Sequence, residues 1–293
     1  MKEQDKKIAQ LVNEEIDKRL LSEQRNIVKE AGQDCAHAYI PKTNLNGKSK
    51  NVEVCINCDQ TRMKPKKINI MCLYWVGNFR GRDFSTKDVE RLYDSVALHI
   101  DREFDFYVLT NDMNAEYNIP AKPIELKYAW PGWWSKVELH RPDLPKGRTL
   151  YMDLDSHVIR NLQPILDYPG DLVMFETGIA KHKYAKLEKT GWVPRYQAAT
   201  MLFDPGCKPM QDVWDTFTAC PDVWMNRYRS EQDIMGAWIP AQPLFPRKWM
   251  IKLDTIRGYT QPPDDTIIVT GQTRDGLFRK THKIKWFEQM ARG

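Results

Sequence analysis

The chain has 293 residues, of which 42% are hydrophobic, and its formal net charge is +5. This composition allows one large folded domain with small attachments, and it excludes a wholly disordered chain. No apolar run reaches the roughly 18–20 residues of a membrane-spanning helix, and the charged start MKEQDKKIAQ lacks the apolar centre of a secretory signal, so we expect a cytoplasmic protein without membrane insertion.

Residues 1–32 are predicted to form an amphipathic helix. Between positions 4 and 31 the apolar residues recur near helical spacing, and Gly32 follows as a stop. Such an apolar stripe must be buried, either on the main domain or against a second copy of the chain. The second choice leaves open a dimer through this helix.

Residues 33–66 contain a candidate zinc knuckle, followed by a Lys- and Pro-rich linker. Cys55-x-x-Cys58 allows two thiolates to reach one ion, and Cys35-x-His37 supplies a second pair. Three cysteines and one histidine form a closed ligand set, so we interpret the site as structural Zn²⁺. The alternative is three scattered cysteines and a surface histidine.

From residue 67 onward the sequence predicts strands alternating with helices. The expected strands are 68–75, 104–110, 149–153, 172–175, 199–203 and 266–269, and the expected helices are 88–99, 134–140, 210–218 and 232–238. This alternation predicts an α/β domain over 67–293 with a mostly parallel sheet that is covered on both faces.

Two acids, Asp153 and Asp155, directly follow the third predicted strand. Ligands of open α/β sheets bind beyond the carboxyl ends of the strands, so both acids lie where a ligand is expected. Two like charges this close are explained if a divalent cation sits between them and a diphosphate. The alternative is a pair of loop acids that cap the next helix.

Together the segments 68–75, 106–112, 131–139 and 151–155 resemble glycosyltransferases of the GT-A fold, within the glycogenin and lipopolysaccharide-galactosyltransferase-like group. The resemblance covers roughly residues 67–293. It implies a Rossmann-like domain that binds a nucleotide sugar, with Mn²⁺ or Mg²⁺ held by Asp153 and Asp155.

The resemblance also implies roles for residues that would bind the donor. Tyr74 and Trp75 end the first strand, where the nucleotide is gripped, although both could equally be core aromatics. Asp112 would hold the base or ribose. Lys136 matches a lysine that contacts the donor, and Trp134, with the preceding tryptophan, would shape the pocket.

Gln232 and Asp233 match an acidic segment that faces the transferred sugar in relatives. The alternative is that these two residues only begin a helix. The resemblance favours retention of the anomeric configuration, in which no separate base is needed. Inversion of the sugar would require a carboxylate base, and Asp233 is the candidate.

One departure from the family pattern concerns the third metal ligand, which in relatives is a histidine just after the last strand. Here the segment 267–272 contains no histidine. Either His282 is a displaced ligand, with Lys280 and Lys283 on the phosphates, or Gln272 substitutes for it.

For the acceptor, the sequence favours a hydroxymethylated pyrimidine in DNA, as in bacteriophage enzymes that act in the host cytoplasm. The zinc knuckle, the basic stretch 273–285 and the polar loop 42–51 support this DNA-binding hypothesis. Three alternatives are a glycosyltransferase for a glycan or lipid-linked acceptor, a non-catalytic zinc-containing nucleic-acid-binding protein and a nucleotidyltransferase. The last lacks its glycine-rich phosphate loop after the first strand.

Overall fold

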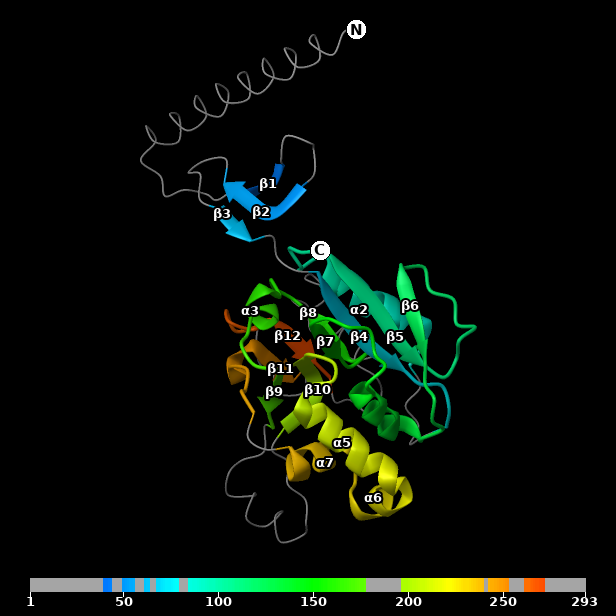
Figure 1. Cartoon of the computed structure of the whole chain (residues 1–293). Coiled ribbons are helices and arrows are strands. Elements are labelled where there is room, and N and C mark those ends of the chain that lie inside the picture. Colours follow the sequence, from blue (N-terminus) through cyan, green and yellow to red (C-terminus); the bar gives the residue numbers. More distant parts are fainter. Residues whose placement is uncertain are drawn as a thin grey trace, which may run out of the picture. The chain divides into compact units, whose positions relative to one another are not determined.

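The computed structural model describes residues 39–43, 49–55, 61–63, 67–78, 84–177, 196–239, 242–252 and 261–271 (Figure 1). The chain divides into two compact units, Met1–Lys66 and Lys67–Gly293. No helix within the described ranges is long and apolar enough to cross a membrane.

The first unit contains a small antiparallel sheet of three strands in the order β1-β2-β3. The strands are β1 (Tyr39–Thr43), β2 (Ser49–Cys55) and β3 (Thr61–Met63). Of the predicted zinc ligands, Cys55 is the last residue of β2, whereas Cys35, His37 and Cys58 lie outside the described residues, as does the predicted helix within 1–32.

The second unit is built on a six-stranded sheet in the order β6-β5-β4-β7-β10-β9. Its strands are β4 (Ile68–Tyr74), β5 (Phe104–Thr110), β6 (Ala121–Glu125), β7 (Thr149–Met152), β9 (Leu172–Glu176) and β10 (Tyr196–Phe203). The pairs from β6 to β7 are parallel, and β10 runs antiparallel to both of its neighbours. The predicted α/β class with a mostly parallel sheet is therefore confirmed.

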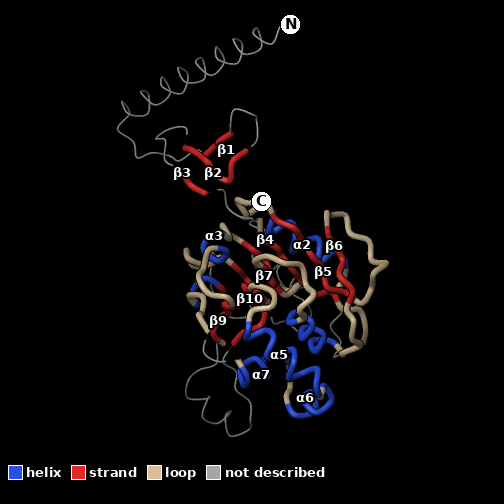
Figure 2. Tube along the Cα trace, in the orientation of Figure 1, coloured by secondary structure: helices blue, strands red, loops and turns tan. Residues whose placement is uncertain are grey.

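Each face of this sheet buries its own apolar cluster. One cluster joins the sheet to α2 (Thr86–Ala97), α3 (Gln163–Leu166) and a smaller sheet of β8 (Ser156–Val158), β11 (Met250–Lys252) and β12 (Ile268–Thr270). The other joins it to the 3₁₀ helix η1 (Gly132–His140), α5 (Lys208–Ala219) and α7 (Glu231–Trp238). The helix α6 (Pro221–Arg227) follows α5 (Figure 2), and η2 (Arg247–Trp249) precedes β11.

Three strands of this unit were not predicted, each for a physical reason. The β6 sequence AKPIE has little apolar patterning and contains a proline, which is tolerated because the strand lies at the sheet edge. The strands β8 and β11 have three residues each, which is too short for a periodic signal.

Candidate active site

A pocket of about 160 Å³ lies where parallel strands β4 and β7 end. Its lining includes Trp75 after β4, Trp133 and Lys136 of η1, and Asp153 and Asp155 after β7. Parallel strands place their carboxyl ends at one edge of a sheet, which explains why residues about 80 positions apart in the sequence meet here.

Asp153 is held in place by hydrogen bonds from three sides. Its backbone N–H donates to the Ala199 carbonyl oxygen of β10 at 2.8 Å. The Tyr151 hydroxyl donates to Asp153 Oδ1 at 2.6 Å, and Lys136 Nζ lies 2.6 Å from Oδ1 and 2.8 Å from Oδ2. Tyr151 and Asp153 are two positions apart in the chain, so strand geometry places both side chains on one face of the sheet.

Lys136 also contacts a second carboxylate, since its Nζ lies 3.5 Å from Glu231 Oε1 at the start of α7. The side chains of Lys136 and Glu231 are 15% and 6% exposed. Burial alone would lower the pKa of Lys136, but Asp153 and Glu231 outweigh it and raise that pKa above its ordinary value. Burial raises the pKa of Glu231, and the ion pair with Lys136 partly offsets this effect. The Lys136 amine is therefore protonated and carries a positive charge.

Among the residues that the structure describes, the site contains more negative than positive formal charge. Three carboxylates, those of Asp153, Asp155 and Glu231, act on the single ammonium of Lys136, which leaves a formal charge of −2 when all are ionised. Lys136 and Glu231 are mostly buried and Asp153 is 22% exposed, so an excess of this size is costly unless a cation or a protonated acid compensates it. One divalent cation would neutralise it.

The donor set fits Mg²⁺ or Mn²⁺ bound together with a substrate phosphate. Such ions are held by one or two carboxylates plus phosphate oxygens, and Asp153 and Asp155 line the same pocket. Within the described residues no cluster of three or more histidine, cysteine or acidic side chains forms a complete protein cage. The predicted third ligands, His282 or Gln272, and the predicted phosphate contacts Lys280 and Lys283, lie outside the described residues.

The predicted aromatic contacts of the donor divide between the pocket and the core. Trp75 lines the pocket, whereas Tyr74 is buried in the cluster on the α2 face. Trp134 is buried and stacks on Phe217 at 5.9 Å between ring centroids. Its neighbour Trp133 lines the pocket instead and donates through Nε1 to the Arg229 carbonyl oxygen at 3.1 Å.

Asp112 forms a turn after β5 and is not among the residues that line the pocket. Its Oδ1 accepts from the Asn114 N–H at 3.2 Å. The preceding residue, Asn111, exchanges two hydrogen bonds with the Val76 backbone at 2.8 and 2.7 Å, which ties the segment after β4 to the end of β5.

Gln232 and Asp233, the predicted sugar-facing pair, follow Glu231 in α7. Gln232 Oε1 accepts from the Ala198 N–H of β10 at 3.3 Å. Asp233 is 1% exposed, and its Oδ2 accepts from the Arg229 N–H at 3.2 Å. Burial raises the pKa of Asp233. Sequence reasoning missed Glu231, although it directly precedes the predicted pair at a helix start.

A second cavity of about 600 Å³ opens beside the ends of β9 and β11. Its polar lining comprises Glu176, Thr177, Gln197, Arg247, Lys248, Lys252 and Thr266. Lys248 Nζ pairs with Asp265 at 2.8 Å. Gln197 lies on β10, two residues before Ala199, which binds the Asp153 backbone. The strand β10 therefore connects the two cavities.

No protein-family model and no curated protein matches the chain. Among solved structures, an active-site mutant of LgtC matches at 13% identity, 76% coverage of this chain, 95% coverage of LgtC and a TM-score of 0.53. The glycosyltransferase GlyE of Streptococcus pneumoniae TIGR4 matches at 11% identity and 77% coverage with a TM-score of 0.53, and the matched region spans 60% of GlyE. The chain thus shares the fold of LgtC and GlyE over about three quarters of its length.

Proposed function

We propose that the chain is a metal-dependent glycosyltransferase that moves a sugar from a nucleotide-sugar donor to a hydroxyl acceptor. The observation that carries this proposal is the group of Asp153 and Asp155, after the end of β7, with Lys136 and the buried Glu231 beside them. This arrangement suits a divalent cation with a diphosphate, and the fold is one that glycosyltransferases use.

Asp153 and Asp155 would hold Mn²⁺ or Mg²⁺, with His282 or Gln272 as third ligand. When bound, the ion supplies positive charge to the leaving diphosphate. Among the residues of the chain, Lys136 would bring its ammonium to the same charge, and Tyr151 fixes the Asp153 carboxylate through its hydroxyl.

Trp75 and Trp133 lie on the pocket wall, where they exclude water and offer aromatic faces to the donor. Lys280 and Lys283 are further candidates for phosphate contacts, and Asp112 for the base or ribose.

We propose that the sugar configuration is retained, because Asp233, the candidate base for inversion, is poorly placed for that role. Inversion needs a carboxylate that reaches the acceptor hydroxyl, but Asp233 is 1% exposed and lines neither cavity. In retention the leaving phosphate takes the acceptor proton, and no such base is required. Gln232 would then contact the transferred sugar from its position beside β10.

For the acceptor we propose a hydroxymethylated pyrimidine in DNA, modified in the cytoplasm. The 600 Å³ cavity has room for an extruded nucleotide, and Arg247, Lys248 and Lys252 bring positive charge to its wall. The basic stretch 273–285 and a zinc site of Cys35, His37, Cys55 and Cys58 would add contacts to the DNA backbone.

The test is nucleotide release from a panel of nucleotide sugars with Mn²⁺, with and without DNA that contains 5-hydroxymethylcytosine or 5-hydroxymethyluracil. We expect release that the modified DNA accelerates and that chelation abolishes. The double variant Asp153→Ala/Asp155→Ala should lose more than 100-fold, in line with the loss of a major electrostatic group. The matched control Asp212→Ala removes an exposed acid of α5 and should keep full activity.

Each outcome of this test has a defined meaning. Release that DNA leaves unchanged would keep the glycosyltransferase and reject the DNA acceptor, and a glycan or lipid-linked acceptor would take its place. An absence of release with every donor, together with an absence of donor binding, would reject the enzyme and favour a nucleic-acid-binding protein.

A further inference from the structure

The Lys136 ammonium lies against both oxygens of Asp153, at 2.6 and 2.8 Å. This is the carboxylate that the proposed function assigns to the divalent metal. The ammonium also makes a cation–π contact with the Tyr151 ring, whose centroid is 5.8 Å from Lys136 Nζ. A lysine thus holds a position on Asp153 that a metal ion would need.

We propose that Lys136 is a resident counter-cation that the divalent metal must displace from Asp153, and that Glu231 is the carboxylate to which the ammonium then moves. This inference rests on the proposed function, since it concerns the same metal. It assigns Lys136 and Glu231 a role in setting metal affinity that is separate from contact with the donor.

The physical reason is that two cations cannot share Asp153 without strong repulsion, because the side chains of Lys136 and Asp153 are only 15% and 22% exposed and water screens their charges incompletely. Lys136 Nζ is already 3.5 Å from Glu231 Oε1, so a small rotation of a flexible side chain completes that ion pair. Glu231 Oε2 is buried and has no hydrogen-bond partner among the described residues, so the acid can accept a further donor.

The arrangement has a consequence for the order of binding. With Lys136 on Asp153, the metal alone binds weakly. A diphosphate that arrives with the metal gives the ammonium a second anion, so metal and donor favour each other's binding. Coupling of this kind is reciprocal by thermodynamic necessity. The pocket would then take up the metal mainly as its complex with the nucleotide.

The experiment measures Mn²⁺ affinity of the full-length chain, without donor, from the free Mn²⁺ signal in electron paramagnetic resonance. Lys136→Met removes the charge at similar volume, and we expect Mn²⁺ to bind about tenfold tighter or more, because a like charge next to the site is gone. Glu231→Gln should bind Mn²⁺ several-fold more weakly, because the displaced ammonium loses its new partner. Lys136→Arg keeps the charge and should not bind more tightly than the wild type.

The matched control is Lys127→Met, which removes an exposed lysine that pairs with Asp143 near the same helix and should leave Mn²⁺ affinity unchanged. In the double variant Lys136→Met/Glu231→Gln, the effect of the Glu231 change should shrink, because no ammonium remains to be displaced. Thermal unfolding of each variant checks that it is folded.

The same measurements on the Lys136→Met variant can also contradict the inference. If folded Lys136→Met binds Mn²⁺ no tighter than the wild type, the inference is wrong, while metal-dependent nucleotide release by the wild type would still stand. If neither protein binds Mn²⁺, alone or with a nucleoside diphosphate, the metal dependence of the proposed function fails too. If only Lys136→Met binds it in the absence of nucleotide, the counter-cation role is supported.

Discussion

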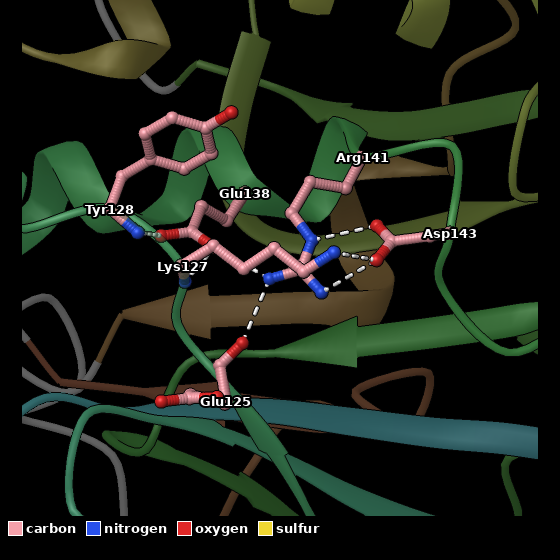
Figure 3. A network of polar contacts seen from close by, with 6 residues as sticks. All are labelled: Glu125, Lys127, Tyr128, Glu138, Arg141 and Asp143. Atoms are coloured by element: carbon pink, nitrogen blue, oxygen red, sulfur yellow. Dashed lines mark hydrogen bonds and ion pairs between the residues drawn. The ribbon is translucent and has the colours of Figure 1, made fainter.

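Glu138 of η1, the helix that carries Lys136, forms a buried ion pair with Arg141, the residue directly after this helix (Figure 3). The Glu138 side chain is fully buried, and Arg141 Nη1 donates to its Oε2 at 2.7 Å. The two Glu138 oxygens also accept the backbone N–H groups of Lys127 and Tyr128, at 2.8 and 2.9 Å. The pair therefore fastens the loop after β6 to η1, and it fixes the base from which Lys136 projects.

At the residue scale, we predict that Glu138→Ala lowers the free energy of unfolding by about 3 kcal/mol or more. It leaves two backbone N–H groups without their acceptor and removes one of the two carboxylates that pair with the buried Arg141 guanidinium. Urea unfolding measures the loss. Lys127→Ala, which removes only an exposed ion pair with Asp143, should cost less than about 1 kcal/mol. A loss below about 1 kcal/mol for Glu138→Ala would show that the loop does not depend on this pair.

At the element scale, the segment after β4 places the Trp75 indole over Gly77. A Cβ added at Gly77 would lie 2.2 Å from Trp75 Cη2 and 2.6 Å from Cζ2, far inside normal contact distance. Only glycine lets the indole lie this way, and this indole lines the candidate donor pocket. The position of one wall of the pocket therefore depends on a residue without a side chain.

We predict that Gly77→Ala pushes the indole aside and raises the KM for the donor roughly threefold to tenfold, which is the effect of losing one aromatic contact. Steady-state kinetics with the donor found in the release assay measures it, and the unfolding midpoint should change little. In the background Trp75→Leu, the same glycine change should add nothing. A full additional effect there would mean that Gly77 acts through another part of the loop.

Much of the α/β architecture could be predicted, because β4, β5 and β7 are apolar runs bounded by turns, and because Asp153 and Asp155 directly follow one of them. The sequence did not predict that Tyr74 would be buried in the core while Trp75 would line the pocket. Successive strand residues point to opposite faces, and the sequence does not say which face carries the pocket.

The contact between Lys136 and Glu231 also could not be predicted from the sequence. It joins η1 to α7 across 95 positions, and it arises only when both helices pack on the same face of the sheet. Local patterns identify a charged residue at a helix start, but they do not identify its partner.

At the scale of the whole molecule, Lys67–Gly293 contains both cavities and both apolar clusters, separately from Met1–Lys66. We predict that a fragment of residues 67–293 folds and releases nucleotide from the donor within about twofold of the full chain, since a unit with its own core can fold alone. Zinc, measured by metal analysis, should remain with residues 1–66 and be absent from the fragment. An insoluble fragment, or one that retains zinc, would contradict this division.

The hydrogen bond from the Gly271 N–H to the Asp155 carbonyl oxygen, at 2.9 Å, anchors the chain beside the acidic pair. His282 follows Gly271 by eleven positions, and eleven residues span at most roughly 40 Å even when fully extended. A group tethered within that radius has a local concentration in the millimolar range. If His282 binds the metal as proposed, a weak intrinsic attraction would suffice to hold it there for much of the time, because the anchor at Gly271 limits its distance from the acidic pair.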